Sequence, residues 1–304
     1  MILAFGAIGD PVGSSALTLN AQNLVRVGHS PDPDDAFMFY GIASGAVDTA
    51  GFEVEQVLED IESLNRRALA GELEVTAVSI HAYAHLADRY ALMSCGASMG
   101  DGYGPVVVAR EAMTLEELAG RTVAIPGTLT SAYLALRLAL GREFEYRVVP
   151  FDQILEDVAG GRADAGLIIH EGQLTYSRLG LHNVVDLGVW WAERTGGLPL
   201  PLGGNVVRRD LGDGTMRLLT RIIRDSIAYG LEHREPALSY ALDYGRGLDS
   251  PMADRFVGMY VNELTRDYGE RGREAIRRFL DEGSAAGIVP TLPELKFVTP
   301  DDSP

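Results

Sequence analysis

Apolar strands and amphipathic helices alternate along the first part of the chain. Residues 24–29 are mostly apolar and predict a buried strand, and a turn rich in Pro and Asp leads from it into an apolar helix over residues 36–47. Residues 52–60 alternate like a second strand, residues 61–70 have helical spacing, and residues 75–79 form another short strand. This order of strand, helix and strand predicts an α/β fold with helices on both faces of a sheet.

The same order recurs in the middle of the chain, before a mostly helical C-terminal part. A strand at 105–110 precedes a short helix at 114–120, in which Glu117 has the position of a capping-box residue. The further strands and helices predicted in this part are 121–127, 128–140, 144–150, 152–161 and 165–170. After about residue 205 the apolar residues recur with helical spacing, and the tail from Pro290 is Pro-rich and irregular.

The length of 304 residues favours two lobes with a cleft between them, because a single hydrophobic core stops growing at about 250 to 300 residues. Residues 1–23 have no clear period and are treated as an N-terminal extension. No apolar run reaches the roughly 18 to 20 residues that span a bilayer. The first residues also lack the basic side chains of an export signal. The sequence therefore predicts a cytoplasmic protein that has no membrane partner.

Acidic side chains outnumber basic ones by 43 to 26, so the formal charge is -17. Because such a chain repels the phosphates of nucleic acids and anionic lipids, we exclude both as partners. The single cysteine, Cys95, excludes an internal disulfide and a cysteine-built metal cluster, and we expect it to be buried and inert. The single lysine, Lys296, lies near the C-terminus, which argues against Schiff-base chemistry. The pattern indicates no particular oligomeric state.

Two segments of the chain resemble each other, residues 70–81 and residues 159–170. Each has a helix that ends at Gly, then a strand, and then a histidine at the carboxyl end of that strand, His81 in the first and His170 in the second. Ligands of open α/β sheets bind outside the carboxyl ends of the strands. We therefore expect each half to present a histidine to the shared cleft.

His170 is the first candidate for a catalytic base, because it lies at the rim of a sheet and imidazole suits proton transfer at neutral pH. The alternative is a histidine that only bonds a loop carbonyl. His81 is the weaker candidate, since its segment is also consistent with a helix that buries His81 or His85. These two histidines have the spacing of metal ligands, but an HExxH motif is missing, so we predict no metal site.

Three hydroxyl groups begin the helix predicted at residues 128–140. Thr128, Thr130 and Ser131 lie beside free backbone N–H groups at the positive end of the helix dipole, which suits a carboxylate. Helix capping explains one of these hydroxyls but not three, and both interpretations stay open. Ser79, at the end of a strand, is a candidate second anchor from the other lobe.

The string GHSPDPDD places Asp32, Asp34 and Asp35 at the start of the helix over residues 36–47. One Asp caps a helix and the dipole favours another, so a structural role explains most of this string. In the functional interpretation, one of the carboxylates accepts hydrogen bonds from substrate hydroxyls. Nucleotide-binding loops and the GxSxG elbow of Ser hydrolases are missing from the sequence.

Strings spread over residues 25–290 resemble the menaquinone-biosynthesis enzymes of the futalosine pathway, and within them the 1,4-dihydroxy-6-naphthoate synthases. They are SPDPDDAFMFY, LEDIESLNRRA, VSIHAY, DRYAL, GASMGDGYGPVVVAR, AGLIIHEGQLTY and VVDLGVWWAERTGGLPLPLG. The resemblance implies the two-lobed α/β fold of type II periplasmic binding proteins, with a central ligand cleft. It implies one lobe of residues 24–108 and 204–290, a second lobe of residues 109–203, and a tail of residues 291–304.

The resemblance also implies an activity. The enzyme would be a carbon–carbon lyase that cleaves cyclic dehypoxanthine futalosine to 1,4-dihydroxy-6-naphthoate and a three-carbon fragment, without a cofactor. The proton-abstracting histidine of the family matches His170, and the contacts to the substrate carboxylate match Ser79 and the region of Thr130 and Ser131. The residues predicted to contact this small carboxylate substrate are Ser79, Thr130, Ser131, Ala77, Val78, Asp32 and Asp34.

Two departures from the family pattern bear on the substrate. The family commonly reads SPCPND where this chain has Asp32 and Asp34, and some members have Lys where this chain has Ala77. Both changes disfavour an anionic substrate, so an altered substrate stays an alternative. Candidate compensating cations are Arg66, Arg67 and Arg178. The alternative functions are a chorismate dehydratase of the same pathway and a non-catalytic solute-binding protein.

Overall fold

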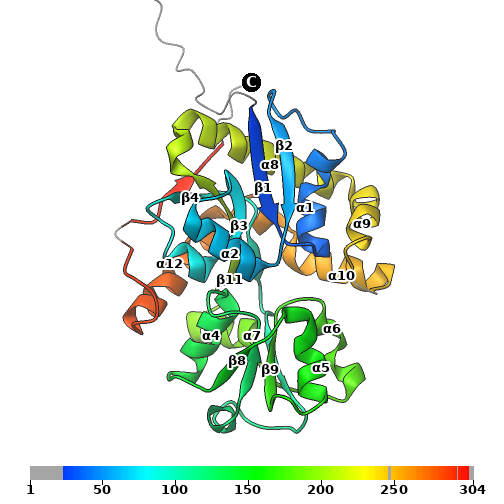
Figure 1. Cartoon of the computed structure of the whole chain (residues 1–304), viewed down its shortest axis with the longest axis vertical. Helices are drawn as coiled ribbons and strands as arrows, with labels where there is room; N and C mark the ends of the chain where they lie inside the picture. The colour runs from blue at the N-terminus through cyan, green and yellow to red at the C-terminus, as the bar shows by residue number, and fades with distance from the viewer. Residues whose placement is uncertain (1–22, 246–247, 293, 301–304) are drawn as a thin grey trace, which may run out of the picture.

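Two β-sheets, each covered by helices, lie one above the other in the computed structural model (Figure 1). The structure describes residues 23–245, 248–292 and 294–300, so nearly all of the predicted N-terminal extension lies outside the described residues. We call the seven-stranded sheet with its helices lobe A, and the five-stranded sheet with its helices lobe B. The predicted α/β fold with two lobes is confirmed.

The sheet of lobe A mixes parallel and antiparallel strands. Its strands are β1 Leu24–His29, β2 Glu53–Leu58, β3 Val75–Ser79, β4 Tyr90–Met93, β5 Ser98–Gly100, β11 Leu200–Arg208 and β12 Phe297–Val298. Their order is β12-β4-β11-β3-β1-β2, and β5 pairs with β11. β1 runs parallel to β2 and β3, whereas β11 runs antiparallel to β3, β4 and β5.

The sheet of lobe B comes from one continuous stretch of chain. Its strands are β6 Val106–Ala109, β7 Val123–Ile125, β8 Tyr146–Val148, β9 Ala165–Ile168 and β10 His182–Asp186. Their order is β10-β6-β9-β7-β8, with β7 parallel to β8 and β9, and β6 antiparallel to β9 and β10. The exact lobe boundaries implied by the resemblance stay a prediction.

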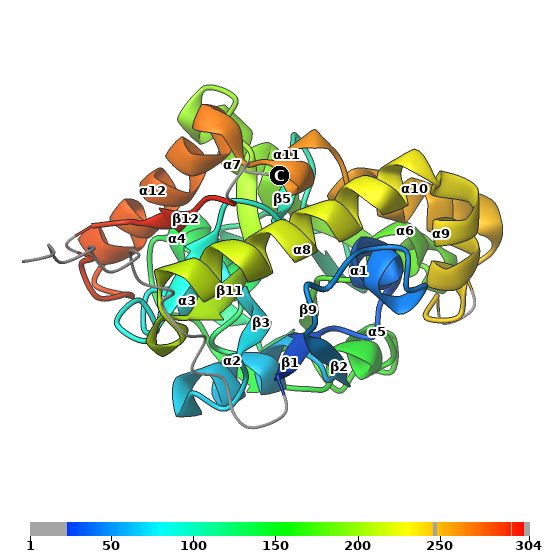
Figure 2. The same ribbon diagram turned by 90° about the horizontal axis from the view of Figure 1, so that it is seen from above.

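Helices cover both sheets. Those of lobe A are α1 Pro33–Ala43, α2 Ile61–Ala70, α3 Ile80–Tyr83, α8 Asp213–Glu232, α9 Arg234–Leu242, α10 Ser250–Tyr260, α11 Glu263–Arg266 and α12 Gly269–Ala285. Those of lobe B are α4 Ser131–Leu140, α5 Ile154–Ala159, α6 Gly172–Thr175 and α7 Leu187–Thr195. Short 3-10 turns are η1 Glu117–Gly120, η2 Phe151–Gln153, η3 Tyr176–Leu179 and η4 Arg209–Leu211. Figure 2 shows α8 running along lobe A toward α9 and α10. Among the described helices, none has both the length and the apolar character that a membrane span requires.

The largest hydrophobic core continues from one lobe into the other. It contains Val78 of lobe A, Val107 of lobe B and Trp191 of α7. Trp191 is fully buried, its Nε1 donates to the carbonyl of Pro199 at 3.1 Å, and its ring packs edge-on against Phe279 of α12 at 5.3 Å. A second core joins α1, α8 and α9 to the sheet of lobe A. Packed side chains therefore join the two lobes, in addition to the connecting chain.

The carboxyl ends of three strands approach the space between the lobes. β1 ends at His29 just before α1, β3 ends at Ser79, and β9 ends two residues before His170. Residues at or just after each of these ends line a shared cavity. This arrangement follows the rule that ligands bind at the carboxyl ends of strands in open α/β sheets.

Candidate active site

One cavity between the lobes contains nearly all of the predicted site. Its walls enclose about 700 Å³, open space at the mouth included. The predicted residues that line it are His170, Ser79, Thr130, Ser131, Ala77, Asp32 and Asp34. Val78 does not line it, because strand alternation turns this side chain into the core, where it is fully buried. Gly203 and Gly204 of β11 form a further part of the wall, where the backbone is bare.

His170 reaches the cavity from the loop after β9 in lobe B. Its Nδ1 lies 3.3 Å from Oδ2 of Asp32, which belongs to lobe A. The side chains of His170 and Asp32 are 12% and 7% exposed. The ring of Phe151 lies 4.1 Å from the imidazole, between centroids, and limits its movement. The expected strand-end position of His170 is confirmed, and the imidazole is fixed between an aromatic ring and a carboxylate.

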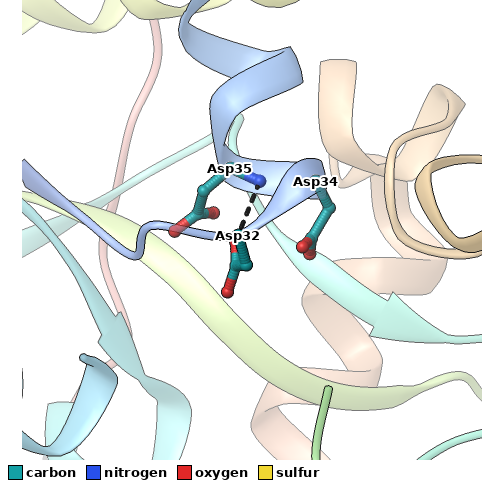
Figure 3. A group of neighbouring side chains, drawn as sticks. All are labelled: Asp32, Asp34 and Asp35. Atoms are coloured by element: carbon teal, nitrogen blue, oxygen red, sulfur yellow. Dashed lines mark hydrogen bonds between the residues drawn. The ribbon is translucent and has the colours of Figure 1, made fainter. Parts of the chain in front are cut away.

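Three buried carboxyl groups begin α1, as Figure 3 shows. Asp32 caps the helix and accepts from the backbone N–H of Asp35 at 3.3 Å, while Asp35 accepts from the N–H of Ser30 at 2.7 Å. Ser98 donates its hydroxyl to Asp34 at 3.2 Å. The capping role predicted from the sequence is therefore filled by Asp32, and the other two carboxyls are placed by separate hydrogen bonds.

Burial raises the pKa of two of these three carboxyl groups. It is the main cause that raises the pKa of Asp34 well above its usual range, and it raises the pKa of Asp35 to about 8, with a further contribution from Asp34. Ligand atoms of the three residues lie within 4.8 Å of one another, close enough to share a cation. Because metal ligands must be deprotonated, two protonated carboxyls make a poor cation site at neutral pH.

The raised pKa of Asp35 predicts that folding stability falls as the pH rises. The folded protein keeps a proton on Asp35 up to about pH 8, whereas the unfolded chain releases it near the ordinary value of about 3.9. The stabilisation is complete at pH values below the pKa of Asp35 in the unfolded chain. It is lost as the pH rises from this pKa to that of the folded protein, at up to about 1.4 kcal/mol per pH unit. Urea unfolding at about pH 5 and about pH 8 measures the free energy of unfolding at each pH, and we expect Asp35→Asn to reduce the difference between the two. The exposed Asp88→Asn serves as control, and equal pH slopes in all three proteins would contradict the prediction.

The hydroxyls at the start of α4 are used inside the protein. Thr130 donates to the carbonyl of Gly127 at 2.9 Å and accepts from the N–H of Tyr133 at 3.2 Å, as a helix cap does. Ser131 accepts from the N–H of His81 and donates to the carbonyl of Leu202. Capping is therefore confirmed for Thr130. The cap uses the N–H of Tyr133, so the helix start offers a ligand the backbone N–H groups of Ser131 and Ala132, for which a helix provides no acceptor.

Ser79 is held by an amide that the sequence did not single out. Its backbone N–H donates to Oδ1 of Asn65 at 2.8 Å, and its hydroxyl oxygen accepts from Nδ2 of Asn65 at 3.1 Å. Because the oxygen is used as an acceptor, the Ser79 O–H is the group that would donate to a ligand. Ala77, two residues earlier on β3, lines the same wall.

Two titratable residues singled out from the sequence are buried outside the cavity wall. His81 lies in α3, where its Nδ1 bonds the carbonyl of Thr130 at 3.2 Å, and burial lowers its pKa to about 4. The expectation that each half presents a histidine is thus wrong for His81, and the helix interpretation is confirmed. Cys95 is buried as predicted, and burial raises the pKa of its thiol to about 12.

The candidate compensating cations do not line the cavity. Arg66 and Arg67 pair with glutamates of lobe A, and Arg178 donates to the sulfur of Met252 at 3.0 Å. The negative charge of a ligand would therefore meet neutral donors, the hydroxyl of Ser79 and the helix N–H groups. Such groups bind anions without a positive side chain.

Sequence reasoning missed Tyr260 of α10, which lines the cavity and is almost fully buried. Its hydroxyl donates to Oε1 of Gln173 at 2.8 Å, which makes a further polar contact between the lobes. Phe151 and Asn65 were missed as well. No local motif marks these residues, because each acquires its role through a contact with a distant part of the chain.

Comparison with known proteins decides the family. Residues 25–285 match the family described as menaquinone biosynthesis. The chain belongs to the menaquinone biosynthesis family. Curated relatives named 1,4-dihydroxy-6-naphthoate synthase are 46% identical over 274 residues in Thermus thermophilus and 39% identical over 277 residues in Streptomyces coelicolor. The alignments cover 90% of this chain and 99% and 97% of the relatives. The resemblance to the menaquinone biosynthesis family is confirmed.

Solved structures confirm the fold expected for this member of the menaquinone biosynthesis family. A protein from Archaeoglobus fulgidus superposes with a TM-score of 0.84 at 47% identity, covering 89% of this chain and 100% of that one. A Candida albicans protein with the generic periplasmic binding protein fold gives a TM-score of 0.68 at 12% identity, covering 91% and 98%. An alkanesulfonate-binding protein from Xanthomonas axonopodis gives a TM-score of 0.66 at 12% identity, covering 88% of this chain and 95% of that one. The predicted two-lobed binding-protein fold is confirmed.

Proposed function

We propose that this chain is a cytoplasmic carbon–carbon lyase of menaquinone biosynthesis that converts cyclic dehypoxanthine futalosine to 1,4-dihydroxy-6-naphthoate without a cofactor. The family and the names of the relatives support an enzyme of this pathway. The observation that carries the proposal is one cavity lined by both His170 and the start of α4. The cavity therefore combines a candidate base with a candidate site for a carboxylate, and the proposed cleavage requires both.

In the proposed reaction, the substrate carboxylate accepts hydrogen bonds from the first turn of α4 and from the hydroxyl of Ser79. His170 removes a proton from the substrate, a carbon–carbon bond breaks, and the ring that becomes aromatic supplies the driving force. Proton transfer by a positioned imidazole contributes about 10² to 10⁴ in rate. The side chains of Thr130 and Ser131 act indirectly, because their hydrogen bonds fix the helix start.

Incubation with cyclic dehypoxanthine futalosine, followed by mass spectrometry, tests this function. We expect 1,4-dihydroxy-6-naphthoate to appear with the wild-type protein. A parallel incubation with chorismate separates the related dehydratase, which would convert chorismate instead. Tight binding of either compound without conversion would indicate a solute-binding protein.

A negative charge at the start of α4 is expected to weaken substrate binding. Ala132 is the second residue of this helix, lines the cavity and is 2% exposed. We expect Ala132→Asp to raise KM about tenfold or more, because its carboxylate repels that of the substrate. Steady-state kinetics would measure the effect. Ala132→Asn has nearly the same shape without the charge, so an equal KM for the two variants would contradict carboxylate binding at this place.

A further inference from the structure

The imidazole of His170 meets a carboxylate from the opposite lobe. Asp32 is the N-cap of α1, whereas His170 follows β9. Nδ1 of His170 and Oδ2 of Asp32 lie 3.3 Å apart. Both side chains are largely buried, and Phe151 packs on the imidazole ring. A buried carboxylate on one ring nitrogen is the arrangement that fixes the tautomer and orientation of a catalytic histidine.

Two further carboxyl groups lie beside Asp32, and the pKa of each is raised. Burial is the largest cause of the raised pKa of Asp34, followed by the charge of Asp32 and a hydrogen bond between the two carboxyls. These causes favour the protonated form of Asp34, whose O–H donates a hydrogen bond to the carboxylate of Asp32. Asp35, with a pKa raised to about 8, is also protonated at neutral pH and is held by Ser30. Other titratable groups on the segments around the imidazole are Glu171, next to it in the chain, Asp152, which follows Phe151 in η2, and Tyr260 of α10, which lines the same cavity.

We propose that Asp32 is a positioning residue for His170, an inference that rests on the reaction proposed above. Asp32 accepts the proton of Nδ1–H, which makes Nε2 the basic nitrogen of the neutral ring. When Nε2 takes the substrate proton, the electron pair of the broken bond to hydrogen stays with the substrate and the ring becomes imidazolium. Asp32 stabilises this cation and does not take its proton.

Asp32→Asn tests the role of the carboxylate. Asp32 caps α1 through Oδ1 and faces Nδ1 of His170 through Oδ2, so an asparagine whose oxygen keeps the cap turns its NH2 group toward Nδ1 and no longer accepts from it. We expect kcat to fall about 10- to 100-fold with little change in KM. The acidic limb of the kcat profile should move to lower pH, since a carboxylate favours the protonated imidazole. Asp32→Glu keeps the charge and should recover part of kcat. If Asp32→Asn does not fold, Asp32→Ser, which also caps helices, replaces it.

Asp249→Asn is the matched control. Asp249 caps α10 and accepts from the N–H of Met252, so this variant also removes one charge from a helix cap. It lies at the opposite end of α10 from Tyr260, and we expect wild-type kinetics. If Asp249→Asn changed kcat and the pH profile as Asp32→Asn does, the effect of Asp32 would be one of net charge and the positioning role would be overturned.

Titration of the imidazole by NMR tests the pairing without turnover. The signal of His170 is assigned as the one missing in His170→Asn, and we expect its titration to move to lower pH in Asp32→Asn and not in Asp249→Asn. If the wild type does not convert the substrate but this movement is observed, the proposed reaction fails and the pairing stands. An unchanged titration in folded Asp32→Asn overturns the positioning role, whatever the kinetics show.

Discussion

Replacing His170 by asparagine should reduce kcat by about 10² to 10⁴ while leaving the protein folded and able to bind its ligand. Asn is polar and smaller than His, but it has no basic nitrogen with which to accept the substrate proton. The carboxylate site that we propose at α4 lies on a different element from His170, which follows β9, so we expect the change to leave it intact. Single-turnover kinetics would measure the lost proton-transfer step, and calorimetry with 1,4-dihydroxy-6-naphthoate would measure retained binding.

His182→Asn is the control for this prediction, because His182 is an exposed histidine of β10 in the same lobe. It should retain wild-type kcat. Near-wild-type turnover in His170→Asn would remove the base assignment, and with it the mechanistic role of Asp32. Loss of both binding and turnover would instead indicate that His170 shapes the cavity.

Trp191→Ala should lower the free energy of unfolding by about 3 to 5 kcal/mol. The indole is fully buried in the core shared by both lobes, packs edge-on against Phe279 and donates to the carbonyl of Pro199. The change leaves a large void and an acceptor without its donor, and each of these costs stability. Urea unfolding followed by far-UV circular dichroism measures the effect without relying on tryptophan fluorescence.

Trp190→Ala is a matched control from the adjacent position. Trp190 is only partly buried, and Arg194 lies over its ring at 5.8 Å from the centroid. Loss of this contact should cost about 1 kcal/mol. If the two variants were equally destabilised, the shared core would not be the source of the effect.

Local sequence patterns predicted the strands and helices well wherever the hydrophobic periodicity and the helix-capping residues indicate the same element. The helix after β1 was expected over residues 36–47 and occupies Pro33–Ala43, because Asp32 caps it and Pro33 fits its first turn. The capping box at 114–120 forms, with Thr114 and Glu117 bonded to each other, but it starts only a 3-10 turn. One reciprocal cap does not offset the cost of extending a helix beyond a single turn.

The sequence did not indicate β11, although it lies inside the sheet of lobe A. Its segment, LPLGGNVVR, contains one Pro and two Gly, which weaken a strand signal, and it becomes a strand by pairing with β3 and β4. The contact between Asp32 and His170 was missed for the same reason. Strand ends and helix caps are local properties, whereas this pairing depends on how the two lobes meet.

The two glycines of β11 have different explanations. A Cβ on Gly204 would lie 3.0 Å from the hydroxyl of Tyr268 and 3.3 Å from Ile80 and Leu92, so packing explains the glycine there. A Cβ on Gly203 would meet only the carbonyl of Val78 at 3.6 Å and Ser98 at 3.9 Å, which are ordinary contacts, and its backbone does not require glycine. The fold would accept a side chain at 203, and the space left without one belongs to the cavity. A side chain at position 203 would therefore narrow the cavity between the lobes without disturbing the sheet.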